Sequence, residues 1–216
     1  MKRLGFFGGT FDPVHIAHLR LALELKAYCQ LDEMRLLPAH IPPHKGVPSA
    51  TPSQRLAMLQ LAIQHCPELS LDTRELLRDC PSYSVETLAQ LRAELGPQVS
   101  ISLAVGGDSL ANLHTWHRWR ELFQYAHLIV AVRPGYQRPQ SGPVAELLAD
   151  SEVEVGQLHQ VSHGGVVVAE LSQLAVSATA IREQIASGYS AQFLLPDPVW
   201  HYIQQHRLYQ QAGADQ

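Results

Sequence analysis

Residues 8–18 read GGTFDPVHIAH and follow a short apolar strand candidate, Arg3 to Phe7. Two glycines, an Asp-Pro turn and two histidines three positions apart stand here at the start of a predicted helix. Residues i and i+3 share one face of a helix, so His15 and His18 can both point toward one ligand. The N–H groups of a first helical turn favour a phosphate, and glycine lets the chain approach a nucleotide closely. The stretch therefore predicts a strand, a phosphate loop and a helix in immediate succession.

Short apolar stretches alternate with amphipathic stretches along the chain. Strands that alternate with helices form right-handed βαβ units around a parallel sheet. The sequence therefore predicts an α/β fold, doubly wound, with a mostly parallel sheet and helices on both faces. The expected strands are 3–7, 35–37, 69–72, 100–105 and 127–132, and the expected helices are 19–28, one opened by 51–54, 84–94 and 198–206.

Polar residues mark the beginnings of several helices. Thr51 and Gln54 have the spacing of a capping box, with a proline between them at the first helical position. Ser84 is the expected cap of the helix that ends near residue 94, and Ser177 with Thr179 is the expected cap of a late helix.

The ends of three expected strands carry glycine. In open parallel sheets, ligands bind beyond the carboxyl ends of the strands, so these ends are expected on one rim. We expect one domain, residues 1–216, on which the helices from about residue 175 onward pack. Residues 136–165 show no clear pattern. The glycine-bearing ends are residues 8–11, 106–109 and 133–135.

The composition, 46% hydrophobic and 17% charged over 216 residues, is that of an ordinary globular protein. The net charge of −4 argues against nucleic-acid binding, which needs dense Lys and Arg. No apolar run approaches the roughly 18 residues of a membrane span. Cys29, Cys66 and Cys80 form no Cys-x-x-Cys pair, which indicates reduced thiols in a cytoplasmic protein. The oligomeric state stays open.

Two common phosphate signatures are absent: G-x-G-x-x-G after the first strand, and the P-loop pattern G-x-x-x-x-G-K-[ST]. His15 and His18 could instead bind zinc from one helix, but the glutamate of H-E-x-x-H is missing and no third ligand is evident, so no metal site is predicted. A purely structural role, as two histidines beside a tight turn, remains a further alternative.

GGTFDPVH followed by His18 resembles the signature of the nucleotidyltransferase superfamily. The segment VSATAIR, residues 176–182, resembles the second phosphate motif of that superfamily, serine-x-threonine-x-x-arginine. With the motifs between them, the whole chain resembles the bacterial nicotinate-nucleotide adenylyltransferases. One departure is Ala17, which stands where the family has a glycine and is tolerable if this residue is helical. The intervening motifs are PPHK at 42–45, PSYSVETL at 81–88, GGDSL at 106–110, Trp116 and RPGY at 133–136.

This resemblance implies an adenylyl transfer from ATP to nicotinate mononucleotide that yields nicotinate adenine dinucleotide and pyrophosphate, a step of NAD biosynthesis. The attacking phosphate is already an anion, so positioning and charge stabilisation would carry the reaction. By its chemistry, Mg²⁺ is expected to bridge the ATP phosphates, although the sequence shows no all-protein cage for it.

The resemblance also implies which residues act. The catalytic candidates are His15, His18, Lys45 and Arg182. The candidates for ATP binding are Gly8, Gly9, Thr10, Phe11, His15, His18, Gly106, Asp108, Arg133, Ser177, Thr179 and Arg182.

For the acceptor, the resemblance places Trp116 against the pyridine ring and the carboxylate on backbone N–H groups near Tyr83, Ser84 and His117. Trp116 and Trp119 could alternatively form a plain core stripe. The candidates for nicotinate mononucleotide binding are Ala39, His40, Tyr83, Ser84, Asp108, Trp116 and His117.

Three alternatives stay open. The first is a related transferase, such as the one that acts on phosphopantetheine; it usually has threonine where His15 stands and a shorter chain. The second is a preference for nicotinamide mononucleotide, which the sequence does not decide. The third is a noncatalytic nucleotide-binding module, which the presence of His18 and Arg182 disfavours.

Overall fold

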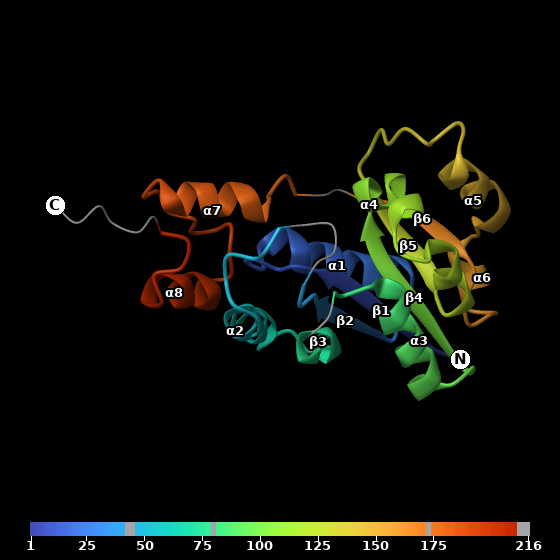
Figure 1. Cartoon of the computed structure of the whole chain (residues 1–216), viewed down its shortest axis with the longest axis horizontal. Helices are drawn as coiled ribbons and strands as arrows, with labels where there is room; N and C mark the ends of the chain where they lie inside the picture. The colour runs from blue at the N-terminus through green and yellow to red at the C-terminus, as the bar shows by residue number, and fades with distance from the viewer. Residues whose placement is uncertain (42–45, 79–80, 172–173, 211–216) are drawn as a thin grey trace.

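The computed structural model describes residues 1–41, 46–78, 81–171 and 174–210. Within these residues, six parallel strands form one sheet in the order β3-β2-β1-β4-β5-β6. The predicted doubly wound parallel sheet is thus confirmed (Figure 1). The strands are β1 (Lys2–Gly9), β2 (Glu33–Pro38), β3 (Leu69–Leu71), β4 (Val99–Gly106), β5 (His127–Val132) and β6 (Val166–Glu170).

Helices cover both faces of this sheet, and within the described ranges the connections contain three short 3₁₀ helices. The α-helices are α1 (Ile16–Tyr28), α2 (Pro52–Ile63), α3 (Ser84–Leu95), α4 (Gly107–Ala111), α5 (Pro143–Ser151), α6 (Val155–Leu158), α7 (Ala178–Ala186) and α8 (Asp197–Gln205). The 3₁₀ turns are η1 (Arg74–Leu77), η2 (Leu113–Thr115) and η3 (Trp119–Gln124).

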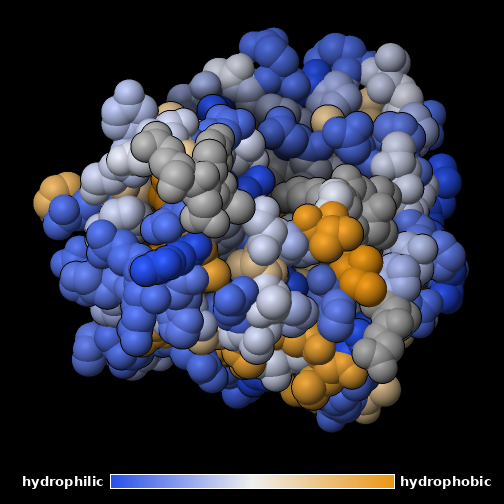
Figure 2. All heavy atoms as spheres, turned by 60° about the vertical axis from the view of Figure 1, so that its left-hand side comes forward, coloured by the Kyte–Doolittle hydropathy of each residue, from blue (hydrophilic) through white to orange (hydrophobic). Residues whose placement is uncertain are grey.

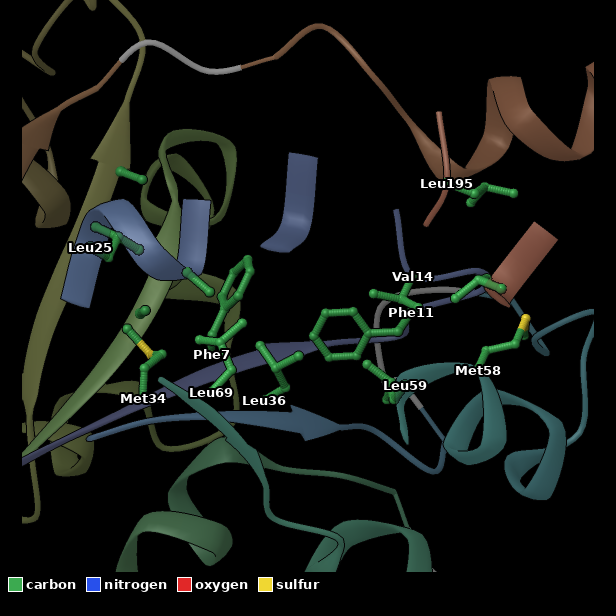
Figure 3. Close-up of a cluster of buried hydrophobic side chains, with 14 of the residues drawn as sticks. Phe7, Phe11, Val14, Leu25, Met34, Leu36, Met58, Leu59, Leu69 and Leu195 are labelled. Carbon is green, nitrogen blue, oxygen red and sulfur yellow. The ribbon is translucent and has the colours of Figure 1, made fainter. Parts of the chain in front are cut away.

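Strand β1 divides the core into two clusters, because successive side chains of a strand point to opposite faces. Phe6 belongs to a cluster with residues of α3, β4 and α5, whereas Phe7 belongs to a cluster with residues of α1, α2, α7 and α8. Phe7 meets the ring of Phe11 edge to face, with the ring centroids 6.0 Å apart (Figure 3). The second cluster therefore reaches from the sheet to the loop that follows β1.

Two of the predicted caps are confirmed. Thr51 Oγ1 accepts a hydrogen bond from the N–H of Gln54 at 3.3 Å, and the Gln54 side chain accepts one from the N–H of Thr51 at 2.9 Å. Ser177 Oγ accepts from the N–H of Ala180 at 3.2 Å, whereas Thr179 lies in the first turn of α7 rather than at its cap. Both helices therefore begin where their sequences indicate.

The segment without a clear pattern, residues 136–165, contains α5 and the single turn α6. The edge strand β6 follows and was not predicted. Its pairing with β5 depends on Gly165, where a Cβ atom would stand 2.8 Å from Val153 and 3.2 Å from the His127 ring. That close approach is a tertiary contact, which no local sequence pattern reports.

Hydrophobic side chains are scattered on the face shown in Figure 2, which is mostly hydrophilic. Over all described residues, the most exposed large hydrophobic side chains are Val47, Leu77, Tyr189 and Phe193. None of the helices in the described ranges is long and apolar enough to cross a membrane.

Candidate active site

A cavity of about 810 Å³ opens at the carboxyl ends of β1 and β4. These neighbouring strands mark the point where the strand order reverses, which is where open α/β sheets bind ligands. Residues 7–10 line one side of the cavity and residues 103–106 another. The predicted convergence of two glycine-bearing strand ends is confirmed, whereas residues 133–135 are not part of this wall.

The two glycines of the phosphate loop serve different purposes. Gly8 lines the cavity, and a Cβ atom there would have no heavy atom within 4 Å. A Cβ atom on Gly9 would stand 2.9 Å from the ring of Phe11, closer than real contacts allow. Gly9 therefore gives Phe11 the space to pack, and Phe11 in turn supports His18, whose ring centroid is 5.0 Å away.

The two motif histidines stack on each other, with ring centroids 3.6 Å apart and an interplanar angle of 21°. His15 caps α1, and its N–H donates to His18 Nδ1 at 3.3 Å. His18 lies on the cavity wall, whereas His15 is 4% exposed and is not part of that wall. The structure therefore presents one imidazole to the cavity and places the other against it as a support. Ala17 lies inside α1 and is helical, so its methyl group needs no unusual backbone.

Burial lowers the pKa of His15 to about 4, so this imidazole is neutral near pH 7. Its Nδ1 atom is buried and has no hydrogen-bond partner among the described residues. His127, in β5, is also neutral, because burial lowers its pKa to about 4. The N–H of Gly165 donates to His127 Nδ1 at 2.9 Å, which leaves Nε2 to donate to the Val161 carbonyl at 3.0 Å.

These two histidines predict a loss of stability in mild acid. A buried base with a lowered pKa must take up its proton mainly in the unfolded state, so stability falls as pH drops from about 6.5 toward 4. Each histidine should cost about 2 kcal/mol between pH 7 and pH 5. Urea unfolding of the ligand-free protein at both pH values measures this. His127→Gln, which cannot be protonated, should remove about half of the loss in the free energy of unfolding between pH 7 and pH 5. A loss equal to that of the parent would show that His127 is not one of the groups responsible.

A fully buried arginine, Arg55, holds the phosphate loop in place. Arg55, in α2, donates through Nη1 to the carbonyl oxygens of Thr10 and Ala39, both at 2.7 Å, and through Nη2 to that of His40 at 3.2 Å. Burial lowers the pKa of this guanidinium. Arg55 thus joins the phosphate loop to the segment after β2. Nothing in its local sequence indicates this role.

Most of the predicted acceptor residues lie on the wall of the same cavity. Trp116 follows η2, and Tyr83 meets the His117 ring with the centroids 4.5 Å apart. Their convergence in one cavity is what the acceptor prediction requires. The predicted acceptor residues on this wall are Ala39, Tyr83, Ser84, Asp108, Trp116 and His117.

Glu75, in η1, also lines this part of the cavity, although sequence reasoning missed it. Its carboxyl accepts a hydrogen bond from the Thr87 hydroxyl at 2.7 Å and interacts with the Ser82 hydroxyl. Burial raises the pKa of this group. The carboxyl is therefore held as a structural part of the wall.

The predicted cap of α3 is wrong in one detail. Tyr83 is the N-cap, without a side-chain hydrogen bond, and Ser84 is the first helical residue. The N–H of Tyr83 donates to the Pro81 carbonyl at 3.0 Å, because the chain turns tightly here. The N–H groups available to an anion therefore begin at Ser84, in the first turn of the helix.

Several predicted residues lie away from the described cavity wall. The ring of His40 is bonded to the Leu76 carbonyl at 3.2 Å, and Arg133 is exposed after β5. Ser177, Thr179 and Arg182 lie on α7 or at its start; Arg182 reaches the loop by donating to the Asp12 carbonyl at 2.6 Å. Lys45 falls outside the described residues.

The chain matches known proteins over almost its full length. The family model described as Cytidylyltransferase-like matches residues 6–184. A protein of Cellvibrio japonicus, named "Probable nicotinate-nucleotide adenylyltransferase", is 54% identical over 206 residues, which cover 95% of this chain and 98% of that protein. The chain belongs to the nicotinate-nucleotide adenylyltransferase family. Another member with the same name, from Dechloromonas aromatica, is 47% identical over 213 residues, with 97% of this chain and 98% of that protein covered.

Solved structures of this family show the same fold. The nicotinic acid mononucleotide adenylyltransferase of Plasmodium falciparum, complexed with NaAD, matches with a TM-score of 0.71. Its sequence is only 15% identical, and the match covers 97% of this chain and 98% of that one. At this identity the likeness concerns the fold, and it confirms the predicted nucleotidyltransferase architecture.

Proposed function

We propose that this protein transfers the adenylyl group of ATP to nicotinate mononucleotide, giving nicotinate adenine dinucleotide and pyrophosphate. One observation carries the proposal beyond family membership: the phosphate loop with His18 and the acceptor segment with Trp116 line one continuous cavity. A transfer between two nucleotides needs both in the same space, with the reacting atoms in line.

In this reaction, a phosphate oxygen of the mononucleotide forms a bond with the α-phosphorus of ATP. The bond between the α-phosphorus and its bridging oxygen breaks, and the electron pair leaves with pyrophosphate. The attacking oxygen is already an anion, so no general base is needed. The protein would act by orienting the phosphates and by stabilising their developing charge.

We propose that His18 holds the phosphates at the reacting end, beside Gly8, Gly9, Thr10 and Gly106 on the wall. Phe11 and the neutral His15 would fix its ring, Phe11 by an edge-to-face contact and His15 by stacking on it. Arg182 would bind the outer phosphates together with Ser177, Thr179 and the start of α7, where a helix N-terminus attracts anions. Lys45 and Arg133 are proposed as further cations for the triphosphate.

Mg²⁺ is proposed to enter with ATP as part of the substrate. Mg²⁺ commonly keeps several waters and binds substrate phosphates with few protein ligands. Among the described residues, no group of three or more His, Cys, Asp or Glu could hold a metal ion. Asp108, exposed on the wall, is proposed to accept hydrogen bonds from a ribose instead.

We also propose that the protein acts in the cytoplasm. The thiols of Cys29 and Cys66 are free, which agrees with a reducing compartment, since disulfides form in oxidising ones.

Turnover with defined acceptors tests the function. The protein is incubated with ATP, Mg²⁺ and either nicotinate or nicotinamide mononucleotide, and pyrophosphate release is measured. We expect turnover with the nicotinate form and a lower kcat/KM with the nicotinamide form. Absence of turnover with nicotinate mononucleotide would refute the proposal, and equal turnover would leave the reaction but overturn the specificity. Pyrophosphate release with phosphopantetheine as the acceptor tests the alternative that the protein is the related transferase.

Trp116→Ala should raise the KM for nicotinate mononucleotide about tenfold, because a stacked aromatic ring contributes roughly 1 kcal/mol beyond its buried area. The KM for ATP should change little. Trp119→Ala is the matched control: this tryptophan is also partly buried but packs under the Arg120 guanidinium, 4.3 Å from its ring centroid, away from the cavity wall. Equal effects of the two variants on acceptor KM would favour the core-stripe alternative.

A further inference from the structure

Asp12, in the turn of the phosphate loop, joins three segments that are distant in sequence. Its carboxyl is buried and accepts from the N–H of Ser49 at 2.7 Å and from that of Ala50 at 3.1 Å. The hydroxyl of Tyr209 donates to Asp12 Oδ1 at 2.8 Å, across 197 positions of the chain. A buried carboxylate needs such donors, so each one constrains its position.

The same residue also contacts the second phosphate motif. Arg182 Nη1 donates to the Asp12 backbone carbonyl at 2.6 Å, while its Nη2 is 3.4 Å from Thr179 Oγ1. The side chain of Asp12 is thus held by Tyr209, and its backbone holds Arg182. A displacement of Asp12 would move both the loop after β1 and a proposed phosphate-binding guanidinium.

The backbone before Tyr209 supports a role beyond filling space. Arg207 has φ 50° and Tyr209 has φ 63°, in the left-handed region that non-glycine residues rarely occupy. Such conformations persist where several surrounding contacts hold the backbone in place. Here the N–H of Leu208 donates to the Ile203 carbonyl at 3.0 Å, and α8 packs against α2. Helices α7 and α8 lie at one end of the molecule, and α5 and α6 lie at the other (Figure 1).

The phenol of Tyr209 is a donor at neutral pH. Burial, and then the charge of Asp12, raise its pKa. The guanidinium groups of Arg55 and Arg182 act on it in the opposite direction, and Arg55 also faces Asp12. The Tyr209 hydroxyl is therefore a neutral donor to the Asp12 carboxylate, and the guanidinium groups of Arg55 and Arg182 act on this pair.

We propose that Tyr209 is a positioning residue for ATP: through Asp12 it holds the phosphate loop and Arg182 in the geometry that receives the triphosphate. This inference rests on the proposed function. It assigns the C-terminal segment a part in the site, although Tyr209 is not on the described cavity wall.

Tyr209→Phe removes only the hydroxyl and tests this role. We expect the Kd for ATP, measured by calorimetry, and the KM for ATP to rise about tenfold. This is roughly the effect of losing one hydrogen bond to a charged group. The Kd for nicotinate mononucleotide should stay within about twofold. Tyr202→Phe is the control, since Tyr202 is also partly buried in this region but contacts the ring of His206, with the centroids 4.2 Å apart and the planes tilted by 36°.

A double-mutant cycle separates positioning from simple packing. Asp12→Asn keeps the size of the side chain but cannot accept every donor, so it should weaken ATP binding as Tyr209→Phe does. In that background, Tyr209→Phe should have a much smaller further effect, because the two residues act as one unit. Full additivity would overturn the proposal, as would a lowered Tm for Tyr209→Phe with unchanged ATP constants.

The outcome is distinguishable from failure of the proposed function. If the parent protein shows no turnover, the proposed function is wrong. ATP binding measured by calorimetry then still tests the positioning role of Tyr209. If the parent turns over and both single variants bind ATP as it does, the function stands and the positioning role is wrong.

Discussion

His18→Ala is expected to lower kcat about 100- to 1,000-fold while the KM for nicotinate mononucleotide changes by less than about threefold. Removal of one preorganised donor to transition-state charge typically costs this much. Of the two motif histidines, His18 is the one on the cavity wall, and it is held there by Phe11 and His15. Its loss should therefore affect the chemical step more than acceptor binding. Steady-state kinetics with each substrate varied in turn measures both effects.

Two further variants sharpen this result. His18→Gln retains an N–H donor and should recover part of the lost rate, which separates hydrogen bonding from mere support of the loop. His114→Ala, at an exposed histidine in η2, should leave kcat unchanged. A kcat of the His18→Ala variant equal to that of the parent would show that this histidine only caps and packs α1.

Arg55→Met should lower the free energy of unfolding by about 3–5 kcal/mol, a large share of the roughly 5–15 kcal/mol typical of a domain. The substitution leaves the part-buried carbonyls of Thr10, Ala39 and His40 without this donor. Each unsatisfied group costs about 1–3 kcal/mol. Urea unfolding measures the change, and the KM for ATP should rise because the phosphate loop loses its support.

Arg55 has a suitable surface control. Arg20→Met removes an exposed guanidinium that pairs with Glu24 one helical turn away, at 2.6 Å. Such pairs contribute about 0.5 kcal/mol or less. Arg55→Lys should behave like Arg55→Met, because a single ammonium cannot reach three carbonyl oxygens in the arginine geometry. A cost below about 1 kcal/mol for both Arg55 variants would contradict the role of this side chain.

Much of the fold could be predicted, because local signals agreed with the final packing. Apolar runs of strand length, the Thr51–Gln54 capping box and the glycine-bearing strand ends all mark elements that the structure contains. The edge strand β6 was not predicted, because α6 is a single turn and the close approach at Gly165 involves Val153 and His127, which are distant in sequence. The cap of α3 was misplaced by one residue, since Ser84 has a capping side chain that the tight turn at Tyr83 leaves unused.

Only some of the motif residues gather on the cavity wall, and Arg133, Ser177, Thr179 and Arg182 lie away from it. His18, Asp108 and Trp116 lie on one wall, as expected. The supports were not predicted: Arg55 and Tyr209 are ordinary residues of amphipathic segments, and only the folded chain brings them to the loop. His15 shows the same limit, because its spacing indicates a shared face with His18 but not its burial.

The sequence by itself determined the strands β1 to β5, the phosphate loop between β1 and α1, and the family to which the chain belongs. These depend on periodicity, caps and motif spacing, all of which are local in the chain. Only the tertiary structure decided which imidazole faces the cavity, which buried cation holds the loop, and that Tyr209 reaches Asp12. The physical reason is that burial and hydrogen-bond partners arise between segments up to 197 positions apart, and no local pattern encodes them.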